Sequence, residues 1–237
     1  MKKRGKQYQD AQKIISVEGT YDLKEAVETL KGISTAKFDE TVELHLTTNV
    51  DTRHADQMVR GVAQLPHGLG KQIRVLVFAD GEAASIARDA GADYIADPAI
   101  MKQIEDGWTD FEVSLAVPDM MSKIGKLGRV LGRKGLMPNP RTGTMVQQQD
   151  LSKAINDAKK GRVEYKTDRT SLIHCPVGKK SFSSEHLTDN VASLMNAVVK
   201  SKPSGVKGIF IRAAYLTSTM GPSIPLDVNK LTSTKID

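Results

Sequence analysis

The sequence is poor in cysteine and in long apolar runs. Cys175 is the single cysteine among 237 residues, which excludes an intrachain disulfide and any zinc site built from several cysteines. So little cysteine is typical of the reducing cytosol. No stretch approaches the roughly 20 continuous apolar residues of a membrane-spanning helix, and the basic start of the chain lacks the apolar segment of a secretory signal. We therefore expect a soluble, cytoplasmic protein with no membrane partner.

Aromatic residues and enzyme motifs are also scarce. With five Tyr, five Phe and one Trp, stacking on aromatic platforms is not expected to be the main binding device. The sequence has no phosphate-binding loop, dinucleotide fingerprint, zinc-protease helix or serine-hydrolase elbow. The five histidines are scattered along the chain. These absences predict a protein that is not an enzyme and has no cofactor, no metal site and no small-molecule substrate.

Basic residues exceed acidic ones. The chain has 34 Lys and Arg against 28 Asp and Glu, a net charge of +6 and a pI near 9.3. Such a balance favours anionic partners, with nucleic acid ahead of a membrane surface. The 39% hydrophobic and 26% charged residues are ordinary for a globular protein. The length is sufficient for two domains.

The two ends of the chain show the pattern of half-buried strands. Apolar and polar residues alternate over residues 41–47, as expected when one face of a sheet is wet. Residues 161–177 predict a hairpin with its turn near residues 167–170, and residues 208–216 predict a further strand. Two helices accompany these strands. One follows Asp22, with Glu25 as its capping-box partner, and the other spans the apolar positions from Leu187 to Val199.

The middle of the chain has a different pattern. Residues 73–79 and 111–117 are nearly continuous apolar runs, typical of strands that are covered on both faces. Helical patterns at residues 83–90 and 98–105 lie between them, and such alternation predicts right-handed crossovers and a parallel sheet. We therefore expect an α/β protein of two domains: a discontinuous α+β sandwich with an antiparallel sheet, and an inserted Rossmann-like α/β domain with a parallel sheet. The expected boundaries are 1–68 and 160–237 for the first domain and 69–159 for the second.

Several segments have chemistry that could serve a function. His174 and Cys175 could form a thiol–imidazole pair, but adjacent strand residues point to opposite faces, which favours a buried thiol and a strand histidine. The most basic segment, residues 123–141, has no acid between Asp119 and Asp150. It fits either a phosphate contact or a solvated, mobile basic tip. A second basic cluster predicts a disordered arm that gains phosphate contacts on binding; its residues are Lys2, Lys3, Arg4 and Lys6.

The polar segment of residues 217–223 follows an apolar-rich run near the C-terminus. It contains hydroxyl side chains, Met220 and a Gly221–Pro222 step, but no acid, histidine or cysteine. Loops on a rigid scaffold carry function more often than the elements they connect. This composition favours a surface that touches a partner over one that reacts with it.

Four separated motifs resemble the bacterial ribosomal protein L-one family, the stalk protein of the large ribosomal subunit. They lie at residues 38–43, 132–140, 173–178 and 217–223, and the resemblance extends over essentially the whole chain. One departure is the Arg133–Lys134 pair, which stands where family members usually have Pro-Arg. It removes a rigid proline and adds charge to the inserted domain.

The resemblance implies a structural ribosomal protein that binds large-subunit rRNA at the mobile stalk. It implies further that the protein assists the movement and release of exit-site tRNA, represses translation of its own operon mRNA and is a monomer within the ribosome. The specific RNA surface would lie on the terminal domain, at Lys37, Phe38, Thr41, Glu43, Thr217, Ser218, Thr219, Met220 and Gly221. A weaker match nearby comprises Lys166, Asp168 and Arg169.

Each of these roles has a physical basis and a structural alternative. The hydroxyls of Thr217, Ser218 and Thr219 can bond ribose hydroxyls, which distinguish RNA from DNA, and the Met220 thioether adapts to a base or ribose face. Gly221 has no side chain to prevent close approach. Glu43 could accept from a ribose hydroxyl or a base amine, or pair with a nearby Lys or Arg. Phe38 could instead pack into the core.

Two other classes of function stay open. Parallel sheets often bind cofactors at the carboxyl ends of their strands, so the inserted domain could belong to a nucleotide-dependent enzyme, although no motif supports one. A non-specific basic nucleic-acid-binding protein would fit the net charge, and it predicts equal affinity for DNA and RNA.

Overall fold

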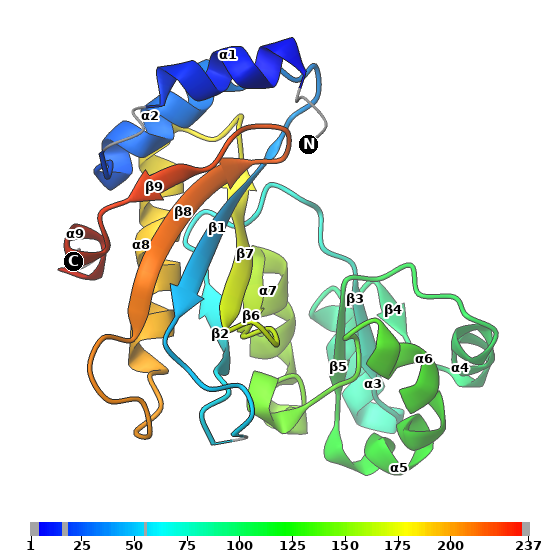
Figure 1. Cartoon of the computed structure of the whole chain (residues 1–237). Helices are drawn as coiled ribbons and strands as arrows, with labels where there is room; N and C mark the ends of the chain where they lie inside the picture. The colour runs from blue at the N-terminus through cyan, green and yellow to red at the C-terminus, as the bar shows by residue number, and fades with distance from the viewer. Residues whose placement is uncertain (1–4, 16–18, 55, 234–237) are drawn as a thin grey trace. The chain divides into compact units, whose positions relative to one another are not determined.

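The computed structural model describes residues 5–15, 19–54 and 56–233 (Figure 1). Of the N-terminal basic cluster, Lys2, Lys3 and Arg4 lie outside the described residues. Lys6 is the first residue of the helix α1 (Lys6–Ile14), so the predicted disordered arm is wrong at that position. The chain divides into a discontinuous unit, Met1–Gly70 with Val163–Asp237, and an inserted unit, Lys71–Arg162. One unit carries an antiparallel sheet and the other a parallel sheet, so the predicted fold class is confirmed. That the discontinuous unit is the one that binds RNA stays a prediction.

The discontinuous unit is built on a four-stranded sheet. Its strands stand in the order β7 (Leu172–Lys179), β1 (Thr41–Thr48), β8 (Ile211–Ser218) and β9 (Ile224–Leu226). All three neighbouring pairs are antiparallel, and His45 of β1 lies opposite His174 on one side and Tyr215 on the other. Residues on adjacent strands that lie opposite each other share a face, so these three side chains are on one face of the sheet.

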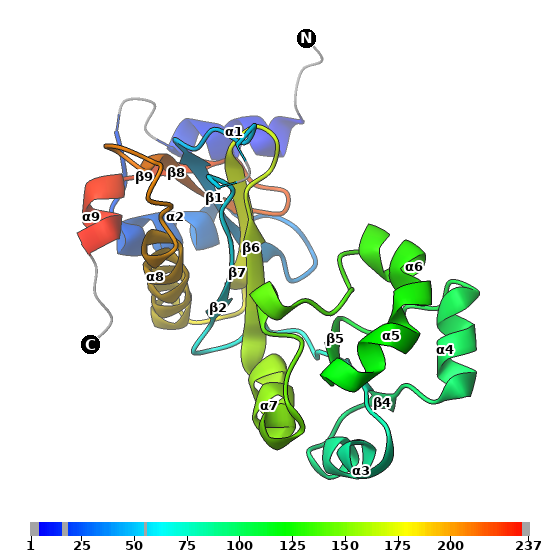
Figure 2. The same ribbon diagram turned by 90° about the horizontal axis from the view of Figure 1, so that it is seen from below.

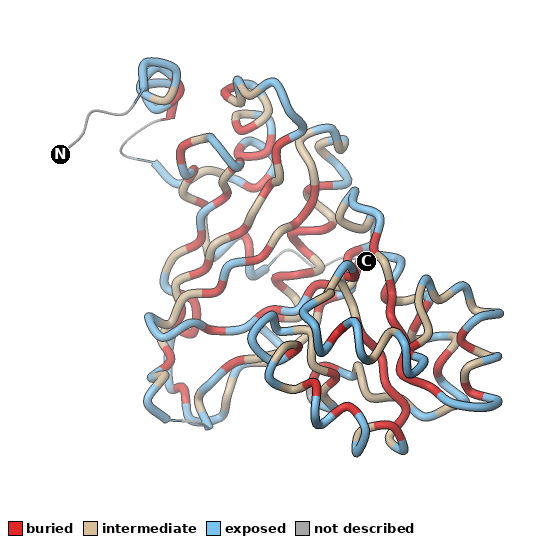
Figure 3. Tube along the Cα trace, turned by 90° about the vertical axis from the view of Figure 1, so that its right-hand side faces the viewer, coloured by how far each residue is buried: buried red, intermediate tan, exposed pale blue. Residues whose placement is uncertain are grey.

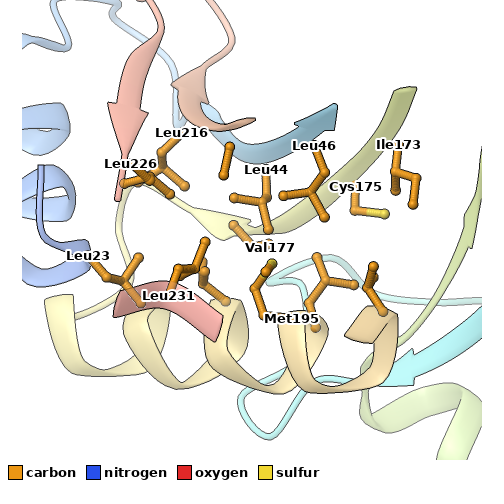
Figure 4. Close-up of a cluster of buried hydrophobic side chains, with 14 of the residues drawn as sticks. Leu23, Leu44, Leu46, Ile173, Cys175, Val177, Met195, Leu216, Leu226 and Leu231 are labelled. Carbon is orange, nitrogen blue, oxygen red and sulfur yellow. The ribbon is translucent and has the colours of Figure 1, made fainter. Parts of the chain in front are cut away.

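The other face of this sheet is covered by two helices. Every second residue of β1 is buried, and Figure 3 shows buried and less buried residues alternating along the chain. Figures 1 and 2 show α2 (Leu23–Ile33) and α8 (Ser184–Lys200) on one side of this sheet. The buried side chains of β1, β7 and β8 belong to one apolar cluster with those of the two helices, part of which Figure 4 shows. Ser183 caps α8 by accepting from the backbone N–H of His186. Asp22 makes no side-chain cap bond to α2, so the predicted capping box is not formed.

The predicted hairpin over residues 161–177 is only partly correct. The turn is there, because the Asp168 carboxylate accepts from the backbone N–H groups of Thr170 and Leu172. However, β6 (Arg162–Lys166) pairs with β2 (Arg60–Gln64) in a separate two-stranded sheet, and Thr167, the residue after β6, forms an isolated bridge with Ile173 of β7. β6 also contacts α8, since the Tyr165 hydroxyl donates to the Ala197 carbonyl at 2.9 Å.

The inserted unit is a three-stranded parallel sheet. The central strand β3 (Val75–Phe78) lies between β4 (Tyr94–Ile95) and β5 (Val113–Ala116). All four residues of β3 are buried, with Val75 and Val77 in one apolar cluster and Leu76 and Phe78 in another. This two-sided burial is the reason for the continuous apolar runs in the sequence.

The remaining elements are short. The inserted unit also contains α3 (Gly81–Asp89), α4 (Pro98–Glu105), α5 (Met121–Ile124), α6 (Gly128–Arg133) and α7 (Leu151–Gly161), with the 3₁₀ helices η1 (Pro118–Met120), η2 (Gly125–Leu127), η3 (Pro140–Thr142) and η4 (Gln148–Asp150). The discontinuous unit adds α1 (Lys6–Ile14) and α9 (Val228–Ser233). Among the described helices none has the length and apolar character to cross a bilayer.

The basic segment of residues 123–141 was expected to be a loop or tip, and its first part is instead helical. Ile124, Leu127 and Leu131 recur at helical spacing and are buried in the core of the inserted unit. Gly125, Gly128 and Gly132 lie within the α5–η2–α6 run, so the backbone there is occupied by helical hydrogen bonds. Lys123 pairs with Asp80 at 3.0 Å. These glycines therefore do not form an open loop that could surround a phosphate.

Candidate RNA interface

The end of β8 is fixed to the start of β1. The backbone N–H of Thr219 donates to the Thr41 carbonyl at 3.1 Å, and the Thr41 N–H donates to the Thr219 hydroxyl oxygen at 3.0 Å. Within the strands, Val42 lies opposite Ser218 and Glu43 opposite Thr217. Thr217 and Ser218 are thus the last residues of a strand, and residues 219–223 form the β8–β9 loop. This pairing brings together the two parts of the predicted surface, residues 37–43 and 217–221.

A groove of about 800 Å³ lies beside this junction. It is lined by three segments: the first half of α1, the connection between α2 and β1, and the β8–β9 loop. The lining residues are Gly5, Lys6, Gln7, Tyr8, Ala11, Ile33, Thr35, Ala36, Lys37, Phe38, Glu40, Thr219, Met220, Gly221 and Pro222. We call this the α1 groove. Five predicted site residues line it: Lys37, Phe38, Thr219, Met220 and Gly221.

Two apolar side chains in the α1 groove are open to solvent. Phe38 is 53% exposed and Met220 is 64% exposed. The alternative in which Phe38 packs into the core is therefore wrong. Large exposed apolar groups within a hollow that also contains cations are typical of a binding surface.

Ser218 and Gly221 form a tight pair under the β8–β9 loop. Ser218 is only 4% exposed, and its hydroxyl has no hydrogen-bond partner within the described ranges. A Cβ atom added at Gly221 would lie 2.5 Å from the Ser218 hydroxyl oxygen. A side chain at position 221 would therefore require the Ser218 hydroxyl to move. Ser218 is buried, and its contact with RNA stays a prediction.

A row of polar side chains crosses the open face of the four-stranded sheet. His45 Nε2 lies 2.9 Å from the Thr217 hydroxyl and 3.5 Å from a Glu43 carboxylate oxygen, and His45 Nδ1 lies 2.7 Å from His174 Nδ1. We call Glu43, His45, Thr217 and His174 the polar row. Burial, and next the neighbouring His174, lower the pKa of His45, while Glu43 opposes this shift.

The described surroundings of Glu43 do not include the Lys or Arg partner that was the alternative to an RNA contact. In the described part of the chain its ion-pair neighbour is His45, and no Lys or Arg lies within 4.0 Å of its carboxylate. Its side chain is 43% exposed. A carboxylate in this setting has lone pairs available for donors from outside the protein.

The model of the ribosomal protein L1p/L10e family matches residues 29–222. The chain belongs to this family. It is 51% identical over 229 residues to the large ribosomal subunit protein uL1 of Dehalococcoides mccartyi (strain CBDB1), covering 97% of each chain. It is 50% identical to the proteins of the same name from Thermomicrobium roseum, with 96% of this chain and 95% of the relative covered, and Limosilactobacillus reuteri, with 96% and 98% covered. These are names of ribosomal proteins and not of enzymes, in agreement with the prediction that this member is not an enzyme.

Sequence reasoning missed two parts of the site. The first is the helix α1, which lies outside the matched residues 29–222 and contributes Gln7 and Tyr8 to the groove beside Lys6. Its signal was present, since Tyr8, Ala11 and Ile15 recur at helical spacing and the latter two are buried. The second is Lys179, whose ammonium donates to the Thr41 hydroxyl at 2.9 Å. Its cross-strand position opposite Thr41 depends on pairing that the sequence alone does not specify.

The weaker candidates occupy a separate position. Lys166, Asp168 and Arg169 line a second pocket of about 430 Å³ together with Thr52, Met58 and Thr167. The turn that contains them meets the far end of β1, where the Thr48 N–H donates to the Ser171 carbonyl. The structure thus does not bring them into the α1 groove. His174 links the two ends, because its Nε2 lies 3.8 Å from an Asp168 carboxylate oxygen.

His174 and Cys175 do not form a thiol–imidazole pair. His174 lies on the open face, with 48% of its side chain exposed, and Cys175 is buried in the core at 1% exposure. Burial raises the pKa of the Cys175 thiol to about 12. The interpretation of Cys175 as a small buried side chain is confirmed.

Proposed function

We propose that this ribosomal protein of the large subunit binds large-subunit rRNA through the α1 groove and the adjoining polar row. The observation that carries the proposal is the junction of Thr41 and Thr219, beside which Phe38 and Met220 line one groove with Lys6 and Lys37. RNA-binding proteins recognise unpaired bases by stacking and edge contacts, and they recognise RNA as such through its ribose hydroxyls.

The roles of the individual residues follow from their surroundings. Phe38 and Met220 supply exposed apolar surface for a base or ribose. Glu43 accepts from a ribose hydroxyl or a base amine. The Thr219 hydroxyl accepts from the Thr41 N–H and donates to the Thr41 carbonyl, and the Thr217 hydroxyl contacts His45. Both hydroxyls therefore hold the protein surface in shape beside the proposed RNA contacts.

Binding titrations test this proposal. The wild-type protein should bind a large-subunit rRNA fragment far more tightly than DNA of the same sequence, and Phe38→Ala should weaken the RNA complex selectively. Ile209 provides a matched control, since it is 73% exposed and lies outside the groove. Ile209→Ala should leave the affinity unchanged. Equal affinity for DNA and RNA would instead favour a non-specific basic binder.

Two further activities belong to this proposal. The resemblance supports assistance in the movement and release of exit-site tRNA, and repression of the protein's own operon mRNA. If the mRNA uses the same surface, it should compete with the rRNA fragment, and Phe38→Ala should weaken both complexes to the same degree. Loss of tRNA release without loss of rRNA binding would identify a separate tRNA surface. The proposed location is the cytoplasmic ribosome.

A further inference from the structure

A buried carboxylate lines the α1 groove and is not fully paired. Glu40 is 1% exposed and is among the lining residues. Its Oε2 accepts from the Ser34 hydroxyl at 2.5 Å, whereas its Oε1 has no hydrogen-bond partner in the part of the chain that the structure describes. An unpaired carboxylate oxygen in a protein interior is unfavourable. A hydrogen-bond donor from a ligand could therefore bind Glu40 Oε1 without displacing a partner that the structure describes.

The residues around Glu40 indicate which kind of ligand would carry this donor. The apolar lining comes from Ala11, Ile33, Ala36 and Pro222, and Phe38 and Met220 add exposed apolar surface. Lys6 and Lys37 also line the groove. The volume of about 800 Å³ is within the range of pockets for small organic groups. A phosphate would meet a carboxylate and apolar walls, so the groove fits a flat, largely apolar group with a donor edge, next to a phosphate that the lysines attract.

We propose that the α1 groove binds an unstacked guanine base of the rRNA, with Glu40 accepting from its N1–H and its N2 amino group. Of the four bases, guanine has two adjacent donors on its Watson–Crick edge. Adenine and cytosine would bring a ring-nitrogen acceptor against the carboxylate, and uracil would bring carbonyl oxygens on either side of its single imino group. The inference rests on the proposed function and specifies one contact within it.

The connection that carries Glu40 can adjust to admit a base. Residues 34–40 form neither helix nor strand, so small changes there break no regular hydrogen-bond ladder. The two ends are well fixed, because the Glu40 carbonyl accepts from the Lys180 N–H at 2.8 Å and the Ser34 carbonyl accepts from the Lys180 ammonium at 2.7 Å. Because Ser34 and Glu40 are held in this way, a base would be accommodated by rearrangement of Lys37 and Phe38, which line the groove.

The test uses the large-subunit rRNA fragment that the full-length protein protects from nuclease. The fragment is resynthesised with inosine in place of each unpaired guanine in turn, which removes the N2 amino group alone. Each RNA is titrated against the wild-type protein, Glu40→Gln and Glu28→Gln. The last variant loses the same charge from an exposed position on α2.

At one guanine, inosine should weaken wild-type and Glu28→Gln binding by roughly 5-fold or more, the lower end of the discrimination seen for edge contacts to bases. In Glu40→Gln the same replacement should change the logarithm of the affinity by less than about half as much, because the contact is already impaired. If Glu40→Gln fails to fold, Ala36→Leu fills the groove while keeping Glu40, and it should remove the inosine effect.

Two results would overturn the inference. One is a protected fragment in which no inosine replacement weakens wild-type binding. The other is an inosine effect of the same size in the wild type and in the Glu40 and Ala36 variants. The absence of any protected large-subunit rRNA fragment would contradict the proposed function itself, so the two failures are distinguishable.

Discussion

Thr219 holds the β8–β9 loop onto Thr41, the first residue of β1, through a backbone bond of 3.1 Å and a side-chain bond of 3.0 Å. The two residues are 178 positions apart in the sequence. Their contact joins residues 37–43 and residues 217–221 into one surface. The candidate site therefore depends on the antiparallel pairing of β1 with β8, and its shape is set by the fold before any RNA is present.

Truncation of Met220 should remove specific affinity and leave the electrostatic part of binding intact. Met220→Ala is expected to cost about 1–3 kcal/mol of rRNA binding with little change in the salt dependence, since a thioether that lies on a base displaces no counterions. Titrations at several salt concentrations measure both quantities. Ile209→Ala is the matched control. A parallel loss of affinity for random RNA would contradict the assigned role.

The pair formed by Gly221 and Ser218 predicts a rescue. Gly221→Ala places a Cβ atom 2.5 Å from the buried Ser218 hydroxyl, and the overlap should lower the free energy of unfolding by about 1–3 kcal/mol. Ser218→Ala removes the clashing oxygen, so the double variant should recover most of the loss. Urea unfolding of the four proteins forms a double-mutant cycle. Additive effects would show that the clash is not the cause.

The basic residues that precede α1 should act through charge alone. Replacing Lys2, Lys3 and Arg4 by glutamine is expected to reduce the slope of log affinity against log salt by roughly 0.7–0.9 for each phosphate that the protein no longer neutralises. The preference for rRNA over random RNA should persist. Lys200→Gln with Lys207→Gln changes exposed cations elsewhere in the same unit, and this control should leave the slope unaltered. A loss of specificity in the N-terminal variant would contradict the prediction.

The polar row predicts a loss of stability in mild acid. Burial and the nearby His174 lower the pKa of His45 below its ordinary 6.5, so the unfolded chain binds this proton at a higher pH than the folded protein does. Stability contributed by neutral His45 is therefore complete above about pH 6.5 and declines as the pH falls through that value toward the lower folded-state pKa.

His45→Gln should accordingly flatten the fall in unfolding free energy between about pH 7.5 and 5.5. Urea unfolding at a series of pH values measures this slope. His54→Gln is the control, because His54 has 64% of its side chain exposed. An unchanged slope in His45→Gln would mean that other groups produce the acid sensitivity.

Much of the fold follows from patterns in the sequence, while its pairings do not. The alternation over residues 41–47 and the continuous runs at β3 and β5 reflect burial on one or both faces, and both predictions are confirmed. Such patterns of apolar residues could not show that β6 pairs with β2 instead of β7. Strand pairing, like the contact of Tyr165 with α8, joins residues that are distant in sequence.

The candidate site was predictable to a similar degree. The family motifs place residues 37–43 and 217–221 on one surface, and the fold puts five of the predicted residues into one groove. Composition alone drew attention to the basic residues 123–141, whose apolar side chains instead belong to a core. The burial of the Ser218 hydroxyl and the unpaired oxygen of Glu40 depend on atomic packing. No periodicity in the sequence carries that information.

Ultraviolet crosslinking of the protein in intact ribosomes, with identification of both the peptide and the RNA, tests the central claim most directly. The account predicts crosslinks from Phe38 and Met220 to a single locus of the large-subunit rRNA. Crosslinks to that rRNA from residues 123–141 alone, or crosslinks from Phe38 and Met220 dispersed over unrelated RNAs, would contradict it.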